Sequence, residues 1–425
     1  MNRVLTPLLI AIGLLLAAML ARSGDAAWMA LPFLAYLALG IARSPSAGAI
    51  RLDATRAVKE TSRGATSSVE VALTIRNRGA EMVQVSLSDP LQPGMQVAPE
   101  NLRQSLVLQA GDSGNLTYTF GSERGDFAWK TVRAVARAPL GLVETVLDLP
   151  AEAAIQVRPE PERFRRLALR PRRTLHSSGS IPARLGGSGT DFWGIREYQP
   201  GDPLRRLDWR LTARHPRHLF TKEFEQEEIA DIGLIVDARR TTDLRVEGSS
   251  LFEHSARAAA SLAETFLRQG NRVSLLVYGE PPISVYPGYG KVQLNRILST
   301  LARVVPEDDV SFNSLQFVPI HMFSSHSLIV VISPLARDDE RLFPRLRAFG
   351  YQVLLISPDP IDFAHRALPA DNVTRLATRL TRVERQLEIY KITQLWIPVI
   401  DWPVDRPLAP LVRHALTHTH IQREH

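Results

Sequence analysis

The side chains with the best spacing for nucleophilic catalysis are Ser250, His254 and Asp243. A nucleophilic serine needs a base within hydrogen-bond reach, and that base needs a third group to orient it. Ser250 and His254 are one helical turn apart, and no Gly-x-Ser-x-Gly turn surrounds the serine to expose it at the end of a strand. The pattern favours a hydroxyl and an imidazole on a helix surface, so we predict no catalytic residues and no enzyme.

Two further patterns could bind a phosphate or a metal ion. Gly186–Gly189 is glycine-rich, but no Lys-Ser or Lys-Thr follows it, which favours a flexible loop. His414, His418 and His420 could reach one metal ion from a helix, but no acidic ligand lies nearby, which favours a polar tail. The chain has no cysteine, so thiolate chemistry and disulfides are excluded. We predict no cofactor.

The elements that would position a site are clearest after residue 230. Apolar runs alternate there with stretches of helical spacing. The expected strands are Ile232–Val236, Arg272–Tyr278, Leu328–Ile332, Val353–Ile356 and Ile397–Ile400, and the expected helices are Ser250–Arg268, Val292–Val304, Asp338–Phe349 and Thr374–Trp396. This alternation predicts a doubly wound α/β domain over residues 231–425, with its ligand crevice at the carboxyl ends of the strands.

Residues 49–158 have a different pattern. Short runs such as Ser68–Ile75 and Leu116–Phe120 alternate apolar and polar side chains, and turn residues such as Gln92–Gly94 separate the runs. Period-2 alternation broken by turns is typical of antiparallel strands. We predict a small antiparallel β-sandwich that serves as an interaction or spacer module.

Two apolar segments, Val4–Ala21 and Ala26–Ala42, lie within residues 1–48. Each is near the lower limit for crossing a hydrocarbon core of about 30 Å, and a short polar linker joins them, so a transmembrane helical hairpin is expected. The surplus of Lys and Arg after the second segment favours both ends inside. A cleavable signal peptide is the alternative for the first segment. Either way we expect a cell inner membrane protein with its folded domains on the cytoplasmic side.

An ordered run of aromatic, charged and turn residues precedes the strand at Ile232–Val236. It contains Asp191, Trp193, Arg196, Glu197, Tyr198, Gly201, Asp202, Arg206, Asp208, Trp209 and Arg214. This run resembles the signature of the family called domain of unknown function 58. Arg124–Phe127 and Pro139–Leu142 are similar to pieces of longer members, although Ala138 replaces the usual aspartate.

The resemblance implies that a von Willebrand factor A-like domain follows the signature. It also implies a partner, because members are commonly encoded beside MoxR-type AAA+ ATPases. The charged residues of the signature could form a surface that recognises a protein partner, with Trp193 and Trp209 as anchors. We favour the alternative, an ion-pair and cation–π network that docks this segment on the α/β domain.

The same resemblance implies where a metal would bind. Von Willebrand A domains carry Asp-x-Ser-x-Ser after the first strand, which offers oxygen ligands to a hard cation such as Mg²⁺. Here Arg239 and Thr241 follow Asp237 at those positions, and Ser333-Pro334 replaces a second aspartate after the fourth strand. Arginine cannot lose its charge, so we predict a degenerate site without Mg²⁺, closed by an ion pair between Arg239 and Asp237.

The connector over residues 159–230 is basic at its start. Its arginines are Arg163, Arg165, Arg166, Arg170, Arg172 and Arg173, and the whole chain has a net charge of +7. Such a cluster could attract an acidic partner or an anionic membrane surface. A solvated linker is the simpler interpretation, and we adopt it.

Together these observations predict a membrane-anchored, non-enzymatic adaptor or scaffold. Its α/β domain would contact a protein partner through Arg239 and Arg240 at the top of the sheet, and the resemblance suggests that an AAA+ ATPase takes part in assembly or maturation of other complexes. No nucleic acid is expected, and the oligomeric state is open. Two alternatives remain: a hydrolase acting at the sheet crevice, and a binder of anionic lipid or nucleic acid through Arg163–Arg173.

Overall fold

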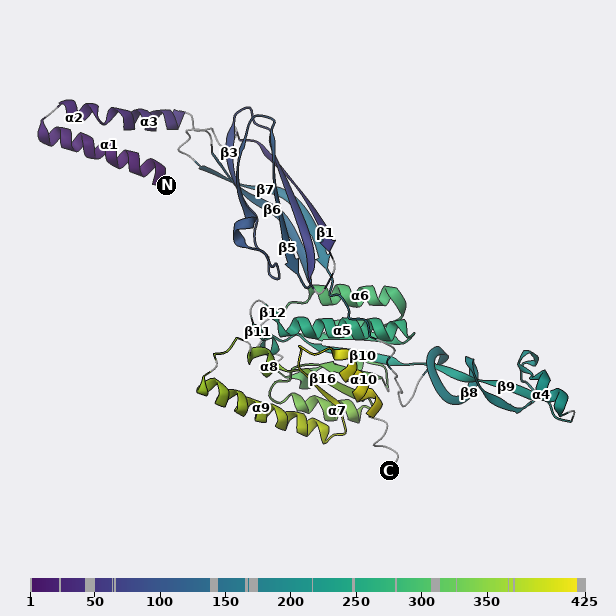
Figure 1. Ribbon diagram of the computed structural model, residues 1–425. Coiled ribbons are helices and arrows are strands. Elements are labelled where there is room, and N and C mark those ends of the chain that lie inside the picture. The colour runs from purple at the N-terminus through teal and green to yellow at the C-terminus, as the bar shows by residue number, and fades with distance from the viewer. Residues whose placement is uncertain are drawn as a thin grey trace. The chain divides into compact units, whose positions relative to one another are not determined.

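The structure, a computed structural model, forms two compact units, residues 1–157 and 158–425, which are described one at a time (Figure 1). The described residues are 2–22, 24–42, 50–62, 64, 66–137, 144–164, 167, 175–215, 217–246, 249–279, 281–306, 314–325, 327–365, 367–369 and 371–418. For residues 2–4, 26, 41, 175–191, 193, 224–228 and 416–418 the description covers the backbone alone.

The predicted transmembrane hairpin is wrong, and with it the fold class that included it. Within the described ranges, no helix is both long and apolar enough to cross a membrane. The first apolar segment forms α1 (Asn2–Ala21), with Pro7 inside it. The second segment is divided into α2 (Gly24–Trp28) and α3 (Leu31–Ala42). A helix of 12 residues is about 18 Å long, which is well short of a hydrocarbon core of about 30 Å.

The rest of the first unit consists of two antiparallel sheets. One has the strand order β1-β2-β5 and the other β4-β3-β6-β7. The strands are β1 (Leu52–Ser62), β2 (Ser67–Asn77), β3 (Val83–Ser88), β4 (Arg103–Leu108), β5 (Ser113–Ser122), β6 (Gly125–Arg137) and β7 (Glu144–Val157). Alternate residues of these strands are buried in a single apolar core, as the period-2 pattern requires.

The second unit contains a six-stranded sheet of order β14-β13-β10-β15-β16-β17, in which only the β13–β14 pair is antiparallel. The strands are β10 (Asp231–Asp237), β13 (Arg272–Tyr278), β14 (Ile283–Gly288), β15 (Leu328–Ile332), β16 (Gln352–Pro358) and β17 (Val399–Trp402). The two-residue strands β11 (Arg245–Val246) and β12 (Ser249–Ser250) pair separately. The central strands β10 and β15 are apolar on both faces because both faces are covered.

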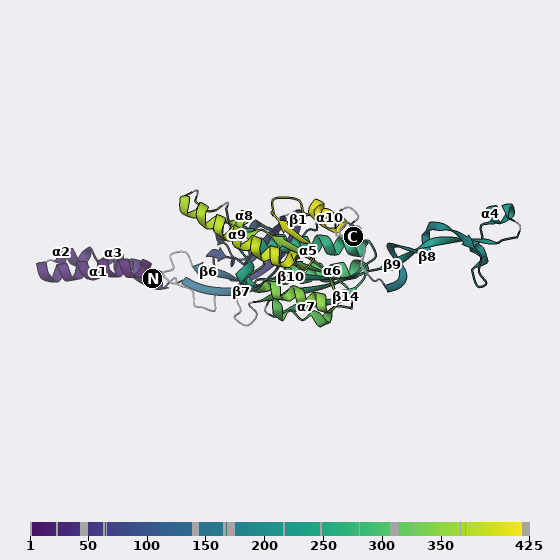
Figure 2. The same ribbon diagram turned by 90° about the horizontal axis from the view of Figure 1, so that it is seen from below.

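The helices of this unit are α5 (Leu251–Arg268), α6 (Gly290–Arg303), α7 (Leu342–Ala348), α8 (Pro360–His365), α9 (Asn372–Thr393) and α10 (Leu408–His418). Side chains of α5, α6 and α10 pack in the core of one face of the sheet. Side chains of α7, together with Ile392 of α9, pack in the core of the other face. Figures 1 and 2 show α7 and α9 across the sheet from α5 and α6.

The signature residues belong to an arm made of β8 (Leu175–Glu197), α4 (Trp209–Arg214) and β9 (Phe220–Ile229). β8 and β9 pair as an antiparallel ribbon with several register shifts. The predicted glycine-rich loop at Gly186–Gly189 is therefore part of a strand rather than a loop.

Candidate functional site

The candidate site lies at the point where the sheet changes its direction of growth. The chain starts in the middle with β10, adds β13 and β14 on one side, and then returns to add β15, β16 and β17 on the other. In open α/β sheets, ligands bind at such a switch point, outside the carboxyl ends of the strands. Asp237 ends β10 and Ser333 directly follows β15, so both lie at this point.

A buried ion-pair cluster fills the switch point. Nε of Arg239 donates to Oδ1 of Asp237 at 2.8 Å, and its Nη2 donates to Oδ2 of the same carboxylate at 2.7 Å. Nη1 and Nη2 of Arg239 also donate to the two carboxylate oxygens of Asp339, at 3.1 and 2.7 Å. The hydroxyl of Ser333 donates to Oδ2 of Asp237 at 2.7 Å. One guanidinium thus bridges two carboxylates from distant parts of the chain.

Burial makes the electrostatics of this cluster strong. Arg239 is 5% exposed and Asp339 is fully buried. Burial alone lowers the pKa of Arg239, but the hydrogen bonds and charges of Asp237 and Asp339 outweigh it and raise that pKa above its ordinary value. The pKa of Asp339 is raised, mainly because burial disfavours its charged form, while Arg239 acts in the opposite direction. Arg239 therefore stays charged, and the cluster depends on it.

The cluster also holds the loop that follows β15. The amide of Ala336 donates to Oδ2 of Asp339 at 2.7 Å, and the amide of Leu335 donates to the hydroxyl of Ser333 at 3.0 Å. Leu335 and Asp338 have φ angles of 64° and 67°, a conformation that costs a residue with a side chain about 1 to 2 kcal/mol. The hydrogen bonds to the buried cluster supply the stabilisation that keeps this loop in place.

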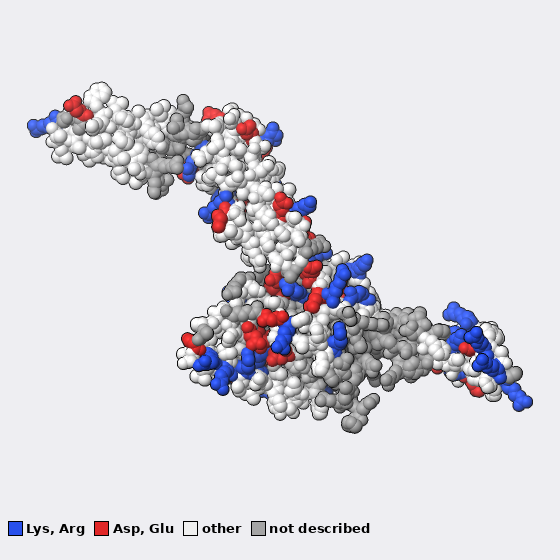
Figure 3. Space-filling view, in the orientation of Figure 1, with Lys and Arg blue, Asp and Glu red and all other residues white. Residues whose placement is uncertain are grey.

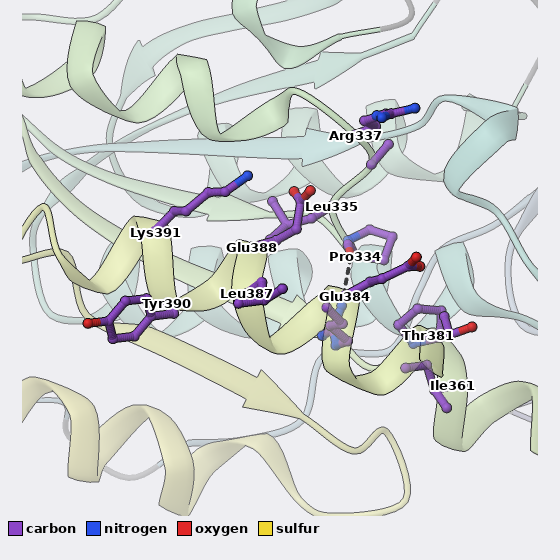
Figure 4. Close-up of a pocket in the computed structure, with 13 residues that line it drawn as sticks. Pro334, Leu335, Arg337, Ile361, Thr381, Glu384, Leu387, Glu388, Tyr390 and Lys391 are labelled. Carbon is purple, nitrogen blue, oxygen red and sulfur yellow. Dashed lines mark hydrogen bonds between the residues drawn. The ribbon is translucent and has the colours of Figure 1, made fainter. Parts of the chain in front are cut away.

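That loop forms one wall of a pocket of about 600 Å³ beside the cluster (Figure 4). The pocket is lined by Pro334, Leu335, Ala336 and Arg337 from the loop, Pro360 and Ile361 from the start of α8, and Thr381, Glu384, Arg385, Leu387, Glu388, Tyr390 and Lys391 from α9. Its volume is within the range of small-molecule sites. Apolar side chains and charged side chains of both signs therefore meet at the carboxyl edge of the sheet.

Arg385 makes several of the contacts that attach the helix wall of the pocket, α9, to the sheet. Arg385 donates to the carbonyl of Pro334 at 2.8 Å, to the hydroxyl of Ser357 at 3.0 Å and to Asp401 at 2.6 Å. The loop after β15 and the strands β16 and β17 are thereby joined at the edge of the sheet. In the same helix, the pKa of Glu388 is raised, first by burial and then by the negative charge of Glu340.

The predicted ion pair between Arg239 and Asp237 is present. Its guanidinium occupies the position where a metal ion would bind in the degenerate site. The Asp237 and Asp339 carboxylates already accept hydrogen bonds from Arg239, Ser333 and backbone amides. With a fixed guanidinium between the two carboxylates, a divalent cation does not fit this site. Thr241 is exposed, and it is Thr242 whose hydroxyl donates to the carbonyl of Arg239, at 2.8 Å.

The two arginines predicted to bind a partner differ in accessibility. The guanidinium of Arg239 lies inside the cluster, so a partner could reach it only if the cluster opened. Arg240 is exposed at the same edge. Partner binding by these residues stays a prediction, and Arg240 is the one in a position to make such a contact.

Sequence reasoning missed Asp339, the second carboxylate of the cluster. It lies inside a segment expected to be helical, Asp338–Phe349, whereas α7 begins at Leu342 and Asp339 begins a short 3₁₀ turn. Nothing in the local sequence distinguishes Asp339 from Asp338. The available signal was indirect. If Arg239 is buried and paired only with Asp237, some of its N–H donors have no acceptor, so a second buried acceptor is required.

The serine, histidine and aspartate considered for hydrolysis have structural roles. Ser250 is the N-cap of α5, and its hydroxyl donates to Asp243 at 2.5 Å rather than to an imidazole. The ring of His254 packs edge-on against Phe363 and Trp402. Ser250 therefore caps α5 and is hydrogen-bonded to Asp243.

The signature residues bind to one another within the arm. Arg196 donates to both oxygens of Asp202, at 2.7 and 2.8 Å, and to Glu223 at 2.8 Å. Asp208 caps α4 by accepting from the amides of Arg210 and Leu211. These bonds stabilise the ribbon and its turn, whereas we predicted that they would dock the connector on the α/β domain.

The remaining signature residues have varied surroundings. Gly201 has a φ of 110°, which explains the need for glycine at that turn. Trp209 is 67% exposed. Figure 3 shows basic side chains gathered on the part of the arm that carries α4, where Arg205, Arg210 and Arg214 are exposed. The side chains of Asp191 and Trp193 lie outside the described residues.

Several other predicted features also fall outside the described residues. They are Arg165, Arg166, Arg170, Arg172 and Arg173 of the basic cluster, His420, and the segment Ala138–Leu142. Arg163 is described and is exposed. The predictions for the basic cluster and for the histidine tail stay predictions.

The fold and this edge define an α/β domain with a buried cluster of paired charges at the carboxyl ends of its strands. Residues 194–393 match the family described as "Protein of unknown function DUF58". The family resemblance is therefore confirmed for this region, which runs from the arm through α9. The likeness to von Willebrand A domains and the ATPase partner stay predictions.

The similar proteins are themselves uncharacterized. The chain is 29% identical over 157 residues to an uncharacterized protein, YeaD, of Bacillus subtilis, and this covers 37% of each chain. It is 32% identical over 128 residues to the uncharacterized proteins Mb1516 of Mycobacterium bovis and Rv1480 of Mycobacterium tuberculosis, which covers 29% of this chain and 38% of theirs. The chain thus spans less than half the length of these relatives.

Similarity to solved structures is weak. A crystal structure of the ApaA protein from Bordetella pertussis matches 25% of this chain at 12% identity and covers 93% of its own, with a TM-score of 0.17. A β-glucosidase from Erythrobacter marinus matches 24% of this chain at 16% identity and covers 15% of its own, with a TM-score of 0.12. Scores this low carry no argument about fold or activity.

Proposed function

We propose that this chain is a non-enzymatic adaptor that binds a protein partner at the carboxyl edge of its α/β sheet. The observation that carries the proposal is that a buried cluster of mutually paired charges lies next to an accessible pocket. Beneath the edge, Asp237, Asp339 and Arg239 satisfy one another. Beside them lies the pocket lined by apolar and charged side chains. A buried network of this kind stabilises the surface above it. Catalytic groups, in contrast, would need to face the pocket, where a substrate could reach them.

The lining of the pocket suits a peptide segment with an apolar anchor and flanking charges. Leu335, Ile361 and Leu387 offer apolar contact, while Arg337 and Glu388 offer charges of opposite sign. Apolar contact would supply most of the affinity, and the charges would select the partner and its orientation. Arg240, exposed at the same edge, would extend this surface.

The proposed partner is a MoxR-type AAA+ ATPase, on the strength of the family resemblance. Such a complex would couple nucleotide state to a client complex through this adaptor. The test is affinity purification of the full chain with and without ATP and Mg²⁺, followed by mass spectrometry. We expect an AAA+ ATPase to be recovered in a nucleotide-dependent manner.

Variants then assign the contact to this edge. Glu388→Lys and Arg240→Glu should each reduce ATPase recovery at least about tenfold, as expected when like charges meet in an interface. The matched control is Arg296→Glu, which reverses an exposed arginine on α6. Failure to recover an ATPase, or equal loss with Arg296→Glu, would contradict the proposal.

A hydrolase acting at the same pocket is the second candidate. It has one specific observation in its favour: Glu388, whose pKa is raised by burial, lies one helical turn from Glu384 in the pocket wall. Two carboxylates with different environments can act as acid and base. Hydrolysis of a panel of ester, glycoside and phosphate substrates that disappears in Glu388→Gln would favour the enzyme over the adaptor.

A further inference from the structure

Helix α9 (Asn372–Thr393) carries apolar side chains at the spacing of a coiled-coil seam. They are Val373, Leu376, Leu380, Val383, Leu387 and Tyr390. Each is between 53% and 76% exposed. Their separations alternate between three and four residues along the whole helix, which is the repeat of 3.5 residues that keeps one stripe facing a partner helix.

The opposite side of α9 is the side that packs on its own domain. Ile392 is fully buried, and the side chain of Arg385 is 8% exposed. In a heptad that assigns the six apolar residues to positions a and d, both Ile392 and Arg385 fall at position f, directly behind the seam. The apolar stripe therefore lies on the side of α9 opposite Ile392 and Arg385, and its Leu387 and Tyr390 also border the pocket.

This arrangement is unlike that of a typical surface helix. In α5 of the same sheet, apolar side chains such as Leu262 and Phe266 are buried against the strands. In α9, Ile392 is buried and Ile389 is half-buried, while the six apolar residues of the stripe are exposed. A surface helix normally turns its apolar stripe toward the core. The stripe of α9 is consequently shaped for a second helix.

We propose that α9 pairs with α9 of a second copy of this chain, as a parallel two-stranded coiled coil. In a parallel pair each layer contains the same residue from both copies, so a seam of uninterrupted a and d residues is complementary to itself. The flanking charges agree with this choice. Arg379 is at a g position and Glu384 at the following e position, so each Arg379 would face Glu384 of the other copy.

The available area is sufficient for a weak but specific dimer. Six side chains of this size and exposure offer on the order of 600 Å² of surface per copy, or about 1,200 Å² in total, which is the lower end of the range for specific interfaces. We therefore expect a dimer that dissociates on dilution in the micromolar range.

A second copy fits the stripe better than a lipid surface does. Helices that lie in a membrane interface present a broad apolar face, whereas a stripe restricted to a and d positions is the narrow seam of a coiled coil. The flanking positions also include Glu384 together with Arg379, rather than basic residues alone.

The inference concerns assembly and goes beyond the proposed adaptor role, and the two surfaces overlap at the C-terminal end of α9. Leu387 and Tyr390 belong to the seam and also line the pocket (Figure 4). Leu376 and Leu380 belong to the seam and are not among the pocket residues. Substitutions at Leu376 and Leu380 therefore test dimerisation without altering the proposed partner site.

The first experiment measures the mass of the full chain by sedimentation equilibrium over a concentration series. We expect twice the mass of one chain at high micromolar concentration. Leu380→Asp should weaken the dimer at least about 100-fold, because it places two carboxylates in an apolar seam. The control is Val292→Asp, which changes a similarly exposed apolar residue on α6, and it should leave the dimer intact.

Charge reversal tests the orientation. Arg379→Glu should weaken the dimer, because each new carboxylate would face Glu384 of the other copy. Adding Glu384→Arg to the same chain should restore it. Because the chain has no cysteine, Leu376→Cys provides a single cross-linking site. It should form a covalent dimer on mild oxidation, since Leu376 meets itself only in the parallel pair.

Three results would overturn the inference. One is a chain that remains monomeric throughout the concentration series. Another is a dimer that Leu380→Asp does not weaken, because its interface would lie elsewhere. The third is a monomer that binds vesicles of anionic lipid and loses that binding with Leu380→Asp, which would assign the stripe to a membrane surface. Arg375→Cys, on the flank of the same helix, is the control for the cross-linking experiment and should not form a covalent dimer.

Discussion

Two clusters of this molecule use the same chemistry in opposite surroundings. At the edge of the sheet, Arg239 bridges Asp237 and Asp339, and in the arm Arg196 bridges Asp202 and Glu223. The shortest nitrogen–oxygen distances are nearly equal, at 2.7 Å in both clusters. The side chain of Arg239 is 5% exposed, whereas that of Arg196 is 35% exposed. Hydrogen-bond geometry alone would therefore predict equal contributions to stability from the two clusters.

Their surroundings and their sequence spans give them different roles. Water and salt screen the arm cluster, so each of its ion pairs contributes little to stability. The buried cluster cannot exchange its partners for water, so losing one member leaves an uncompensated charge. The arm cluster joins residues within 27 positions of each other, while the buried cluster joins residues 100 positions apart. The first organises a local ribbon, and the second is part of the cooperative core.

The strongest test of this difference is Arg239→Ala. It leaves Asp237 and Asp339 buried without their common counter-charge, so we expect the free energy of unfolding to fall by about 3 to 5 kcal/mol. Urea denaturation at pH 7 measures the change. Arg240→Ala, at the exposed neighbour, should change stability by no more than about 0.5 kcal/mol. Equal effects of the two variants would remove the distinction between the clusters.

An alkaline titration probes the same buried region through Tyr278. The guanidinium of Arg239 lies 6.0 Å from the Tyr278 ring, and the phenol donates to the carbonyl of Ser314 at 3.0 Å. Burial is the main reason that the pKa of Tyr278 is raised to about 12. Because the folded pKa exceeds the unfolded value of about 10, its contribution to stability is complete below pH 10 and is lost as pH rises toward 12.

We therefore expect wild type to lose up to about 3 kcal/mol between pH 10 and 12 relative to Tyr278→Phe, which has no phenol to ionise. Chemical denaturation of both proteins at several alkaline pH values measures the difference. Parallel pH profiles for the two proteins would mean that the phenol is not desolvated in the fold.

Ser333→Ala should have a smaller effect, of about 1 to 2 kcal/mol, because it removes one donor from Asp237 and one acceptor from the amide of Leu335. The same variant should loosen the loop after β15. Faster amide hydrogen exchange at residues 335–337 would report that change. Unchanged exchange would mean that Asp339 holds this loop without help from Ser333.

The smallest global effect is expected from Arg196→Ala. Unfolding of the α/β domain should be unaffected, while proteolytic cleavage within residues 196–223 becomes faster because the ribbon loses its ion pairs. Arg217→Ala, an exposed arginine in the same arm, is the control. A large decrease in global stability with Arg196→Ala would show that the arm is part of the cooperative core.

The arm also has a predicted response to acid. Hydrogen bonds from Arg196, followed by one from the amide of Gln199, hold the pKa of Asp202 below its usual value. A lowered folded pKa means that the contribution is present above the unfolded value of about 3.9 and is lost as pH falls through the folded pKa. Protection of the arm from proteolysis should be constant from pH 7 to 5 and should fall only below pH 4.

The sequence by itself determined the periodic elements of this protein. The patterns at Arg272–Tyr278 and Leu328–Ile332 predicted β13 and β15 at their observed bounds, because buried strands are continuously apolar. The ion pair between Asp237 and Arg239 was also predictable, since the two residues are close in sequence. The membrane hairpin was wrong because hydropathy did not reveal that the second segment divides into two short helices.

Only the tertiary structure decided which residues meet and which remain uncovered. Asp339 joins Arg239 across 100 positions because β10 and β15 lie side by side in the sheet, and no local pattern encodes that neighbour. The helical spacing of α9 predicted a helix, but not that Leu376 and Leu380 would face outward. Periodicity describes one element at a time, whereas burial is a property of how elements pack together, so the cluster and the uncovered seam depend on the packing of the sheet.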